Sequence, residues 1–125
     1  MGVLRVKPGV RFDRIDPAGF RLLAALDNSA RACDHDLTIT CGTEAHATTD
    51  PHSLGRAYDV RSKNLDPAEK DRLVRTVLET VAEPGEALID TSGGLACRQF
   101  FGWLEHAGEE NEHIHFQQRR FTEFP

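Results

Sequence analysis

The stretch HIHFQ, residues 113–117, places the strongest constraint on the fold, because polar and apolar side chains alternate along its whole length. Successive side chains of a strand point to opposite faces, so His113, His115 and Gln117 would share one face and Ile114 and Phe116 the other. On a helix the two histidines would point in nearly opposite directions. We therefore expect a strand whose apolar face joins the core and whose other face presents two imidazoles.

Two segments are predicted to be helices. Asp16-Pro17 has the form of an N-cap followed by proline at the first helical position. Apolar side chains at helical spacing then continue to about residue 33, namely Phe20, Leu23, Leu26 and Ala30. The second helix is predicted to start at Asp66, with Glu69 completing a capping box, and to end before residues 83–85. Its apolar stripe consists of Leu73, Val74, Val77, Leu78 and Val81.

Other segments have the patterns of strands. DLTITC, residues 36–41, alternates strictly, so Leu37, Ile39 and Cys41 are expected to face the core. AYDVRS (57–62) and EALIDT (86–91) are predicted strands, and CRQFFGWLE (97–105) suits either a strand or a short helix. Helices and strands follow one another without a regular β-α-β period. This order indicates an α+β fold, a small, mainly antiparallel sheet with helices packed on it, in one domain over residues 1–125.

Length and charge exclude several classes of protein. The chain has 125 residues, enough for one substantial core. Its formal net charge of −5 argues against a nucleic-acid partner, which would require a basic face. No apolar run approaches the ~20 residues that span a bilayer, and the first residues lack the apolar core of a secretory signal. We expect a monomer that is cytoplasmic as synthesised.

The cysteines do not indicate a disulfide framework. Cys33, Cys41 and Cys97 are odd in number and have no CxxC spacing. We therefore predict small buried hydrophobic side chains rather than disulfides or a cysteine zinc site.

The stretch DPHSLGRAYDV, residues 50–60, supplies the partners for the two histidines. If AYDV is a strand beside HIHFQ, Asp59 and His115 can converge, and the preceding loop can bring His52 over them. Two imidazoles and one carboxylate occupy three corners of a zinc tetrahedron and leave the fourth for water. The nearby acids Glu109, Glu110 and Glu112 could provide a general base. A loop held by hydrogen bonds to Asp59, and a solvated acidic turn, are the alternatives.

With these two motifs the chain resembles the zinc metallopeptidases that include D-alanyl-D-alanine carboxypeptidases, L-alanyl-D-glutamate endolysins and the hedgehog signalling domain. The first motif matches at His52, Gly55, Ala57 and Asp59, and the second at Glu112, His113 and His115. The resemblance covers residues 37–118 and implies a fold of that family. It also implies a zinc ion (Zn²⁺) held by His52, Asp59 and His115, with Glu112 as general base and His113 hydrogen-bonded to the developing oxyanion. The implied partner is a cell-wall peptide of bacteria, or a short peptide with a D-amino acid, and the implied place of action is the cell wall.

Two departures from the family pattern and one geometric objection affect this interpretation. The family's serine two residues before the first histidine is Asp50 here. The arginine expected after the first strand is missing from Cys41-Gly42-Thr43-Glu44, which leaves Arg56, Arg61 or another arginine to replace it. On a regular strand, finally, Glu112 and His115 face opposite sides, so Glu112 reaches the metal only through a bend, and Glu109 is the second candidate for the base.

Two other functions compete with a peptidase. A domain could keep the fold and the metal but serve a binding or structural role without activity. An iron oxygenase with two histidines and one carboxylate is disfavoured, because six residues separate His52 from Asp59 where that class has one.

Overall fold

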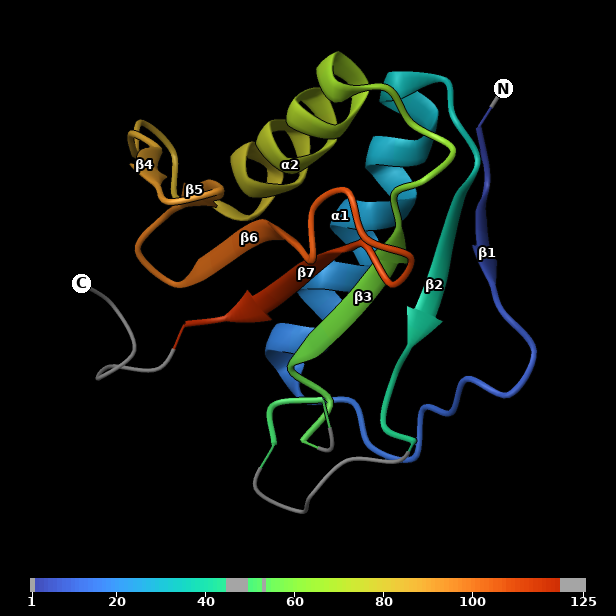
Figure 1. The fold of residues 1–125 in the computed structure, drawn as a ribbon. Coiled ribbons are helices and arrows are strands. Elements are labelled where there is room, and N and C mark those ends of the chain that lie inside the picture. Colours follow the sequence, from blue (N-terminus) through green and yellow to red (C-terminus); the bar gives the residue numbers. More distant parts are fainter. Residues whose placement is uncertain (1, 45–49, 53, 120–125) are drawn as a thin grey trace.

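The computed structural model describes residues 2–44, 50–52 and 54–119, which form two helices and a seven-stranded sheet (Figure 1). Residues 45–49 and 53, which belong to the loop between β2 and β3, therefore lie outside the described residues. The elements are, in chain order, β1 (Leu4–Val6), α1 (Pro17–Cys33), β2 (Leu37–Cys41), β3 (Ala57–Arg61), α2 (Pro67–Val81), β4 (Ile89–Thr91), β5 (Gly94–Ala96), β6 (Phe100–Glu105) and β7 (His113–Gln118).

The strands are ordered β1-β2-β3-β7-β6-β5-β4 across the sheet. β1 runs parallel to β2, and every other neighbouring pair is antiparallel. The α+β class is confirmed, whereas the expected small, mainly antiparallel sheet is corrected to a seven-stranded mixed one. The difference comes from three-residue strands such as β1 and β5, which are too short to show an alternating pattern.

Both helices lie on the same side of the sheet (Figure 1). The core between these two layers contains Tyr58 and Val60 from β3, Ile114 and Phe116 from β7, and the apolar stripes of the helices. The predicted alternation of HIHFQ is confirmed, since Ile114 and Phe116 are fully buried there. The other side chains of β3 and β7 must then lie on the face that the helices leave open.

Each helix begins where its capping residue predicts. Asp16 accepts a hydrogen bond from the Ala18 backbone, and Asp66 and Glu69 form a reciprocal capping box. The predicted stripe of α1 is wrong at Phe20, which is 60% exposed. The buried face is instead formed by Leu22, Ala25, Leu26 and Ala30, so small alanines, whose hydrophobic signal is weak, take part in the core. Neither helix of the described chain is long and apolar enough to cross a membrane.

The segment that suited either a helix or a strand is the strand β6. It alternates around Gly102, where an added Cβ would lie 2.7 Å from a ring carbon of Phe116. Gly102 therefore faces the core, and Phe101, Trp103 and Glu105 face the open side together with their β7 partners Gln117, His115 and His113. This register places an acid and two aromatic side chains beside the histidines.

Candidate metal site

The site lies at the centre of the sheet, on its open face. β3 and β7 pair so that Asp59 is directly opposite His115. Side chains opposite each other in an antiparallel pair are nearest neighbours. The hydrogen bond between His115 Nδ1 and Asp59 Oδ1 is 2.8 Å long. Sequence alternation and pairing together thus bring two of the predicted ligands into contact.

His52 reaches the same carboxylate from the loop before β3. Its backbone N–H donates to Asp50 Oδ1 at 2.8 Å, so the aspartate at the family's serine position holds this turn. Gly55 has a φ of +69°, and an added Cβ would lie 2.1 Å from the Arg14 carbonyl oxygen. Only glycine fits this close return of the chain. The turn leaves His52 5% exposed, with its Nε2 3.3 Å from Asp59 Oδ1.

The electrostatics of the three side chains are coupled. Burial acts to raise the pKa of Asp59, but the hydrogen bonds from His115 and His52 outweigh it and hold that pKa well below its ordinary value. Burial acts to lower the pKa of His115, and its hydrogen bonds to Asp59 and Gln117 outweigh this effect and raise it. The rings of His52 and His115 are 5.0 Å apart between centroids. A carboxylate held ionised between two imidazoles suits a cation.

Gln117 fixes the orientation of the His115 ring. Its Oε1 lies 2.8 Å from His115 Nε2, on the side of the ring away from Asp59. An Nε2–H that donates to this amide leaves Nδ1 to donate to the Asp59 carboxylate, and Nδ1 would release its proton when it binds a metal. Such an outer contact orients a histidine for metal binding.

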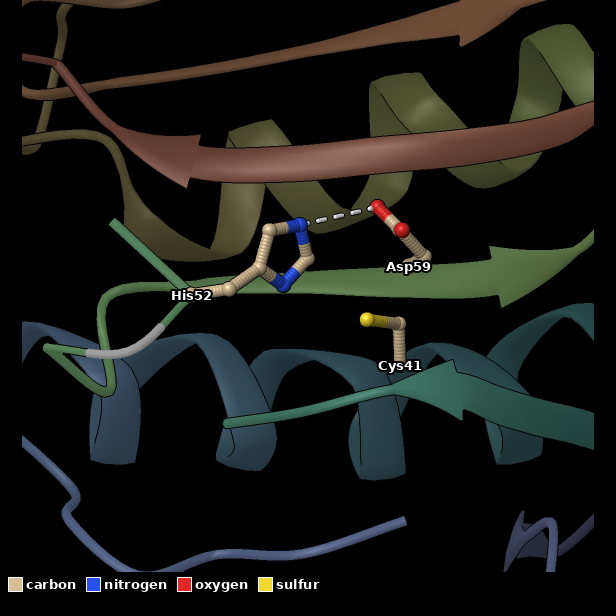
Figure 2. Close-up of side chains that lie close together, drawn as sticks. All are labelled: Cys41, His52 and Asp59. Atoms are coloured by element: carbon tan, nitrogen blue, oxygen red, sulfur yellow. Dashed lines mark ion pairs between the residues drawn. The ribbon is translucent and has the colours of Figure 1, made fainter. Parts of the chain in front are cut away.

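Cys41 is a further member of the cluster that the sequence did not predict. Cys41 Sγ, one nitrogen of His52 and one carboxylate oxygen of Asp59 lie within 4.8 Å of one another, so these three residues could hold a metal ion (Figure 2). Cys41 is opposite Asp59, whereas Ile39 is opposite Val60, so β2 uses two residues where β3 uses one. This bulge turns Cys41 out of the core where strict alternation had placed it.

The environment of the Cys41 thiol is anionic. Burial and the negative charges of Asp59 and Glu44 raise its pKa to about 12 in the metal-free protein. The half-buried thiol is therefore protonated at neutral pH. A divalent cation would reverse this preference, because metal binding deprotonates a coordinating thiol.

Glu105 and His113 lie directly beside the cluster of His52, Asp59 and His115. His113 Nε2 lies 3.3 Å from Glu105 Oε2 and 3.6 Å from Asp59 Oδ2. Glu105 Oε1 lies 3.6 Å from His115 Nδ1 and accepts a 3.0 Å hydrogen bond from the Trp103 indole. Glu105 is thus a carboxylate held within reach of both histidines of β7.

Glu112 is placed elsewhere. Its Oε1 accepts 2.7 Å hydrogen bonds from Ser62 and from the Lys70 ammonium of α2, and its Oε2 accepts from the Gly108 backbone. These contacts, led by the Gly108 N–H, lower its pKa to about 2. The structure therefore does not bring Glu112 to the cluster, and the bend that would turn it there is absent from β7, which begins at His113. Glu109, the second candidate, is exposed and contacts His106.

The two arginines proposed to replace the missing one have different positions. Arg56 forms an ion pair with Asp16 at the start of α1, at 3.3 Å. Arg61 is opposite His113 on the open face. It lines a cavity of about 250 Å³ with Lys7, Thr40, Lys63, Glu110, Asn111, Glu112 and His113. Arg61 is therefore the arginine on the side of the site.

The predicted ligands His52, Asp59 and His115 lie together, while Cys41, Glu105 and Gln117 were missed. Alternation within CRQFFGWLE would have indicated Glu105 once that segment was known to be a strand, and Gln117 shares a face with His115. The bulge at Cys41 left no signal in the sequence. No protein-family model, curated protein or solved structure matches this chain.

Proposed function

We propose that this protein is a zinc-dependent peptidase that hydrolyses bacterial cell-wall peptides or other short peptides containing a D-amino acid. The observation that carries the proposal is the meeting of His52 Nε2 and His115 Nδ1 at Asp59 Oδ1, at 3.3 Å and 2.8 Å. Two imidazole nitrogens and a carboxylate oxygen are a donor set that fits zinc. The sequence motifs around these residues resemble those of zinc peptidases of the same substrate class.

A bound zinc ion would lower the pKa of a coordinated water towards neutrality and polarise a peptide carbonyl. The chain must then supply a base for the water's proton. Glu105 fits this role, because its Oε1 is 3.6 Å from the His115 nitrogen that faces Asp59. The carboxylate can pass the same proton to the leaving amine, as general acid.

His113 is positioned to stabilise the oxyanion that develops on the scissile carbonyl. Its Nδ1 lies 2.9 Å from the Asn111 carbonyl oxygen. Because a carbonyl oxygen only accepts, Nδ1 is the donor of this hydrogen bond. Glu105 and Asp59 flank its Nε2, at 3.3 Å and 3.6 Å. An imidazole protonated at Nε2 can donate a hydrogen bond to a negatively charged oxygen.

Arg61 supports a substrate with a free carboxylate. It is adjacent to His113 across the strand pair and borders the open-face cavity together with Lys7 and Lys63. A guanidinium binds a carboxylate through two parallel hydrogen bonds. A peptide whose carboxylate contacts Arg61 would extend its backbone along β7 toward His115.

The proposal is tested by measuring metal content and peptide hydrolysis together. We expect one zinc per chain in the wild type and hydrolysis of D-alanyl-D-alanine or L-alanyl-D-glutamate peptides, detected as released amine. Glu105→Gln should keep the zinc and lose most of the activity, and Glu112→Gln is the matched control. A zinc-free wild-type protein, after incubation with zinc at neutral pH, would refute the proposal.

The alternative is a metal-binding domain of the same fold without activity. The absence of an arginine at the family's expected position favours this alternative. The presence of Glu105 and His113 beside the proposed ligands disfavours it. Bound zinc without hydrolysis of any of these peptides would support the alternative.

A further inference from the structure

We propose that Cys41 is a ligand of the same metal ion, so that the resting centre has four protein ligands: Cys41, His52, Asp59 and His115. This inference rests on the proposed function for the presence of the ion, and it adds a residue that the resemblance does not include. The compact group of ligand atoms within 4.8 Å contains Cys41 together with His52 and Asp59. His115 joins this group through Asp59, whose Oδ1 lies 2.8 Å from His115 Nδ1.

The backbone at Cys41 is held firmly in the required orientation. Glu44 accepts hydrogen bonds from the Gly42 and Arg11 backbones, and the Thr43 N–H donates to the Arg11 carbonyl at 2.8 Å. An added Cβ on Gly42 would lie 2.3 Å from that same carbonyl oxygen, so the segments are in close contact. The bulge and this close contact together present the Cys41 side chain to Asp59 and His52 (Figure 2). A thiol held by the backbone in this way is preorganised for an ion.

Charge balance favours the thiolate. His52 and His115 bind a cation as neutral imidazoles, and Asp59 contributes one negative charge, so one positive charge of a divalent ion would remain uncompensated. Burial of an unbalanced charge is costly. A thiolate at Cys41 neutralises it, and the thiol proton is released to solvent when the sulfur binds the metal. A sulfur ligand also selects zinc or cobalt over magnesium and calcium.

Four protein ligands complete a tetrahedral resting site, so a water or a peptide oxygen would bind as a fifth ligand or in place of Cys41. The wild type would therefore act on peptides through one of these two routes. Modification of the Cys41 thiol, for example by alkylation, would remove one ligand from the site. The chemistry of Cys41 would in this way control a peptidase whose other residues are already in place.

Cobalt(II) is the probe for this inference, because a thiolate ligand gives an intense near-ultraviolet charge-transfer band that nitrogen and oxygen ligands do not. We expect wild type to bind one cobalt per chain with this band. Cys33→Ser, which changes a cysteine at the far end of α1, should keep the band. Cys41→Ser should lose it and bind cobalt at least about tenfold more weakly, with circular dichroism confirming that it folds.

A second measurement needs no variant. X-ray absorption spectroscopy of the zinc-loaded wild type should show one sulfur ligand at about 2.3 Å from the metal, beside the nitrogen and oxygen ligands. One cobalt per chain without the band, together with a zinc centre without a sulfur ligand, would overturn the inference and leave the proposed metal site intact. Failure of the wild type to bind cobalt or zinc would overturn both.

Discussion

Glu105 and Glu112 are both neighbours of His113, but they belong to different regions of the molecule. Glu112 precedes His113 in the chain, and its side chain bonds to Ser62 and to Lys70 of the helix α2. Glu105 is seven residues earlier, and its side chain lies with His113 on the open face of the sheet. Strand pairing, rather than closeness in sequence, therefore decides which acid can serve the site. Glu105 is proposed to act in catalysis, and Glu112 stabilises the fold.

The largest expected effect is the loss of zinc binding on the open face of the sheet. Asp59→Ala and His115→Ala should each abolish zinc binding, because Asp59 Oδ1 is the atom on which both histidines converge. Metal content after gel filtration, by mass spectrometry, checks this result. Glu112→Gln serves as control and should retain the zinc. Zinc retained in both alanine variants would place the metal elsewhere.

The second-largest effect is on kcat, and it distinguishes Glu105 from Glu112 as the general base. Glu105→Gln should lower kcat by about 10²–10⁴-fold, the usual contribution of a general base, while zinc content stays unchanged. Glu112→Gln should change kcat little. The measurement is a steady-state assay of released amine with both variants at the same zinc occupancy. The reverse pattern would restore Glu112 as the base, as the sequence motif predicts.

Stability should show the opposite order. Glu112→Gln should lower the free energy of unfolding at pH 7 by about 1–3 kcal/mol, the cost of disrupting a buried, charged hydrogen-bond group. Glu105→Gln should cost less, since Glu105 is partly exposed. Urea denaturation of the metal-free proteins measures both. Equal losses in the two variants would contradict the division of roles.

The pH dependence of the unfolding free energy tests the same role of Glu112. The pKa of Glu112 is lowered from 4.5 to about 2 on folding, so the stabilisation is present above pH 4.5 and is lost as the pH falls towards 2. The difference in unfolding free energy between wild type and Glu112→Gln should therefore shrink over this interval. A difference that stays constant from pH 5 to pH 2 would show that the carboxylate's charge does not stabilise the fold.

The smallest effect concerns substrate binding. Arg61→Ala should raise KM by about tenfold, equivalent to one lost charged hydrogen-bond contact, with kcat nearly unchanged. Arg56→Ala, whose partner is Asp16, is the control and should affect stability instead. The effect should disappear with a substrate whose carboxylate is amidated. An unchanged KM for the free acid would remove Arg61 from the site.

Much of the fold could be predicted from local patterns. The starts of α1 and α2 follow from Asp16 and Asp66, whose side chains cap the first turns. The faces of β3 and β7 follow from alternation of period two. The burial of α1 was misplaced, because small residues such as Ala25 carry a weak hydrophobic signal although they are fully buried.

The residues of the site were predicted only where they belong to short sequence motifs. His52, Asp59 and His115 lie in two short patterns, and they are together in the structure. The position of Cys41 depends on the pairing of β2 with β3, and that of Glu105 on the pairing of β6 with β7. A bulge or a register cannot be deduced from one strand alone.

The position of β7 has a consequence for how the protein folds. β7 is the last strand along the described chain, yet it lies between β3 and β6 in the interior of the sheet. Its pairing with β3 joins residues 56 positions apart at Asp59 and His115. Contacts between such distant segments form late and slow the search for the native state. A metal site that contains Asp59 and His115 would be complete only after β7 has paired with β3, so binding of the metal would report this late step of folding.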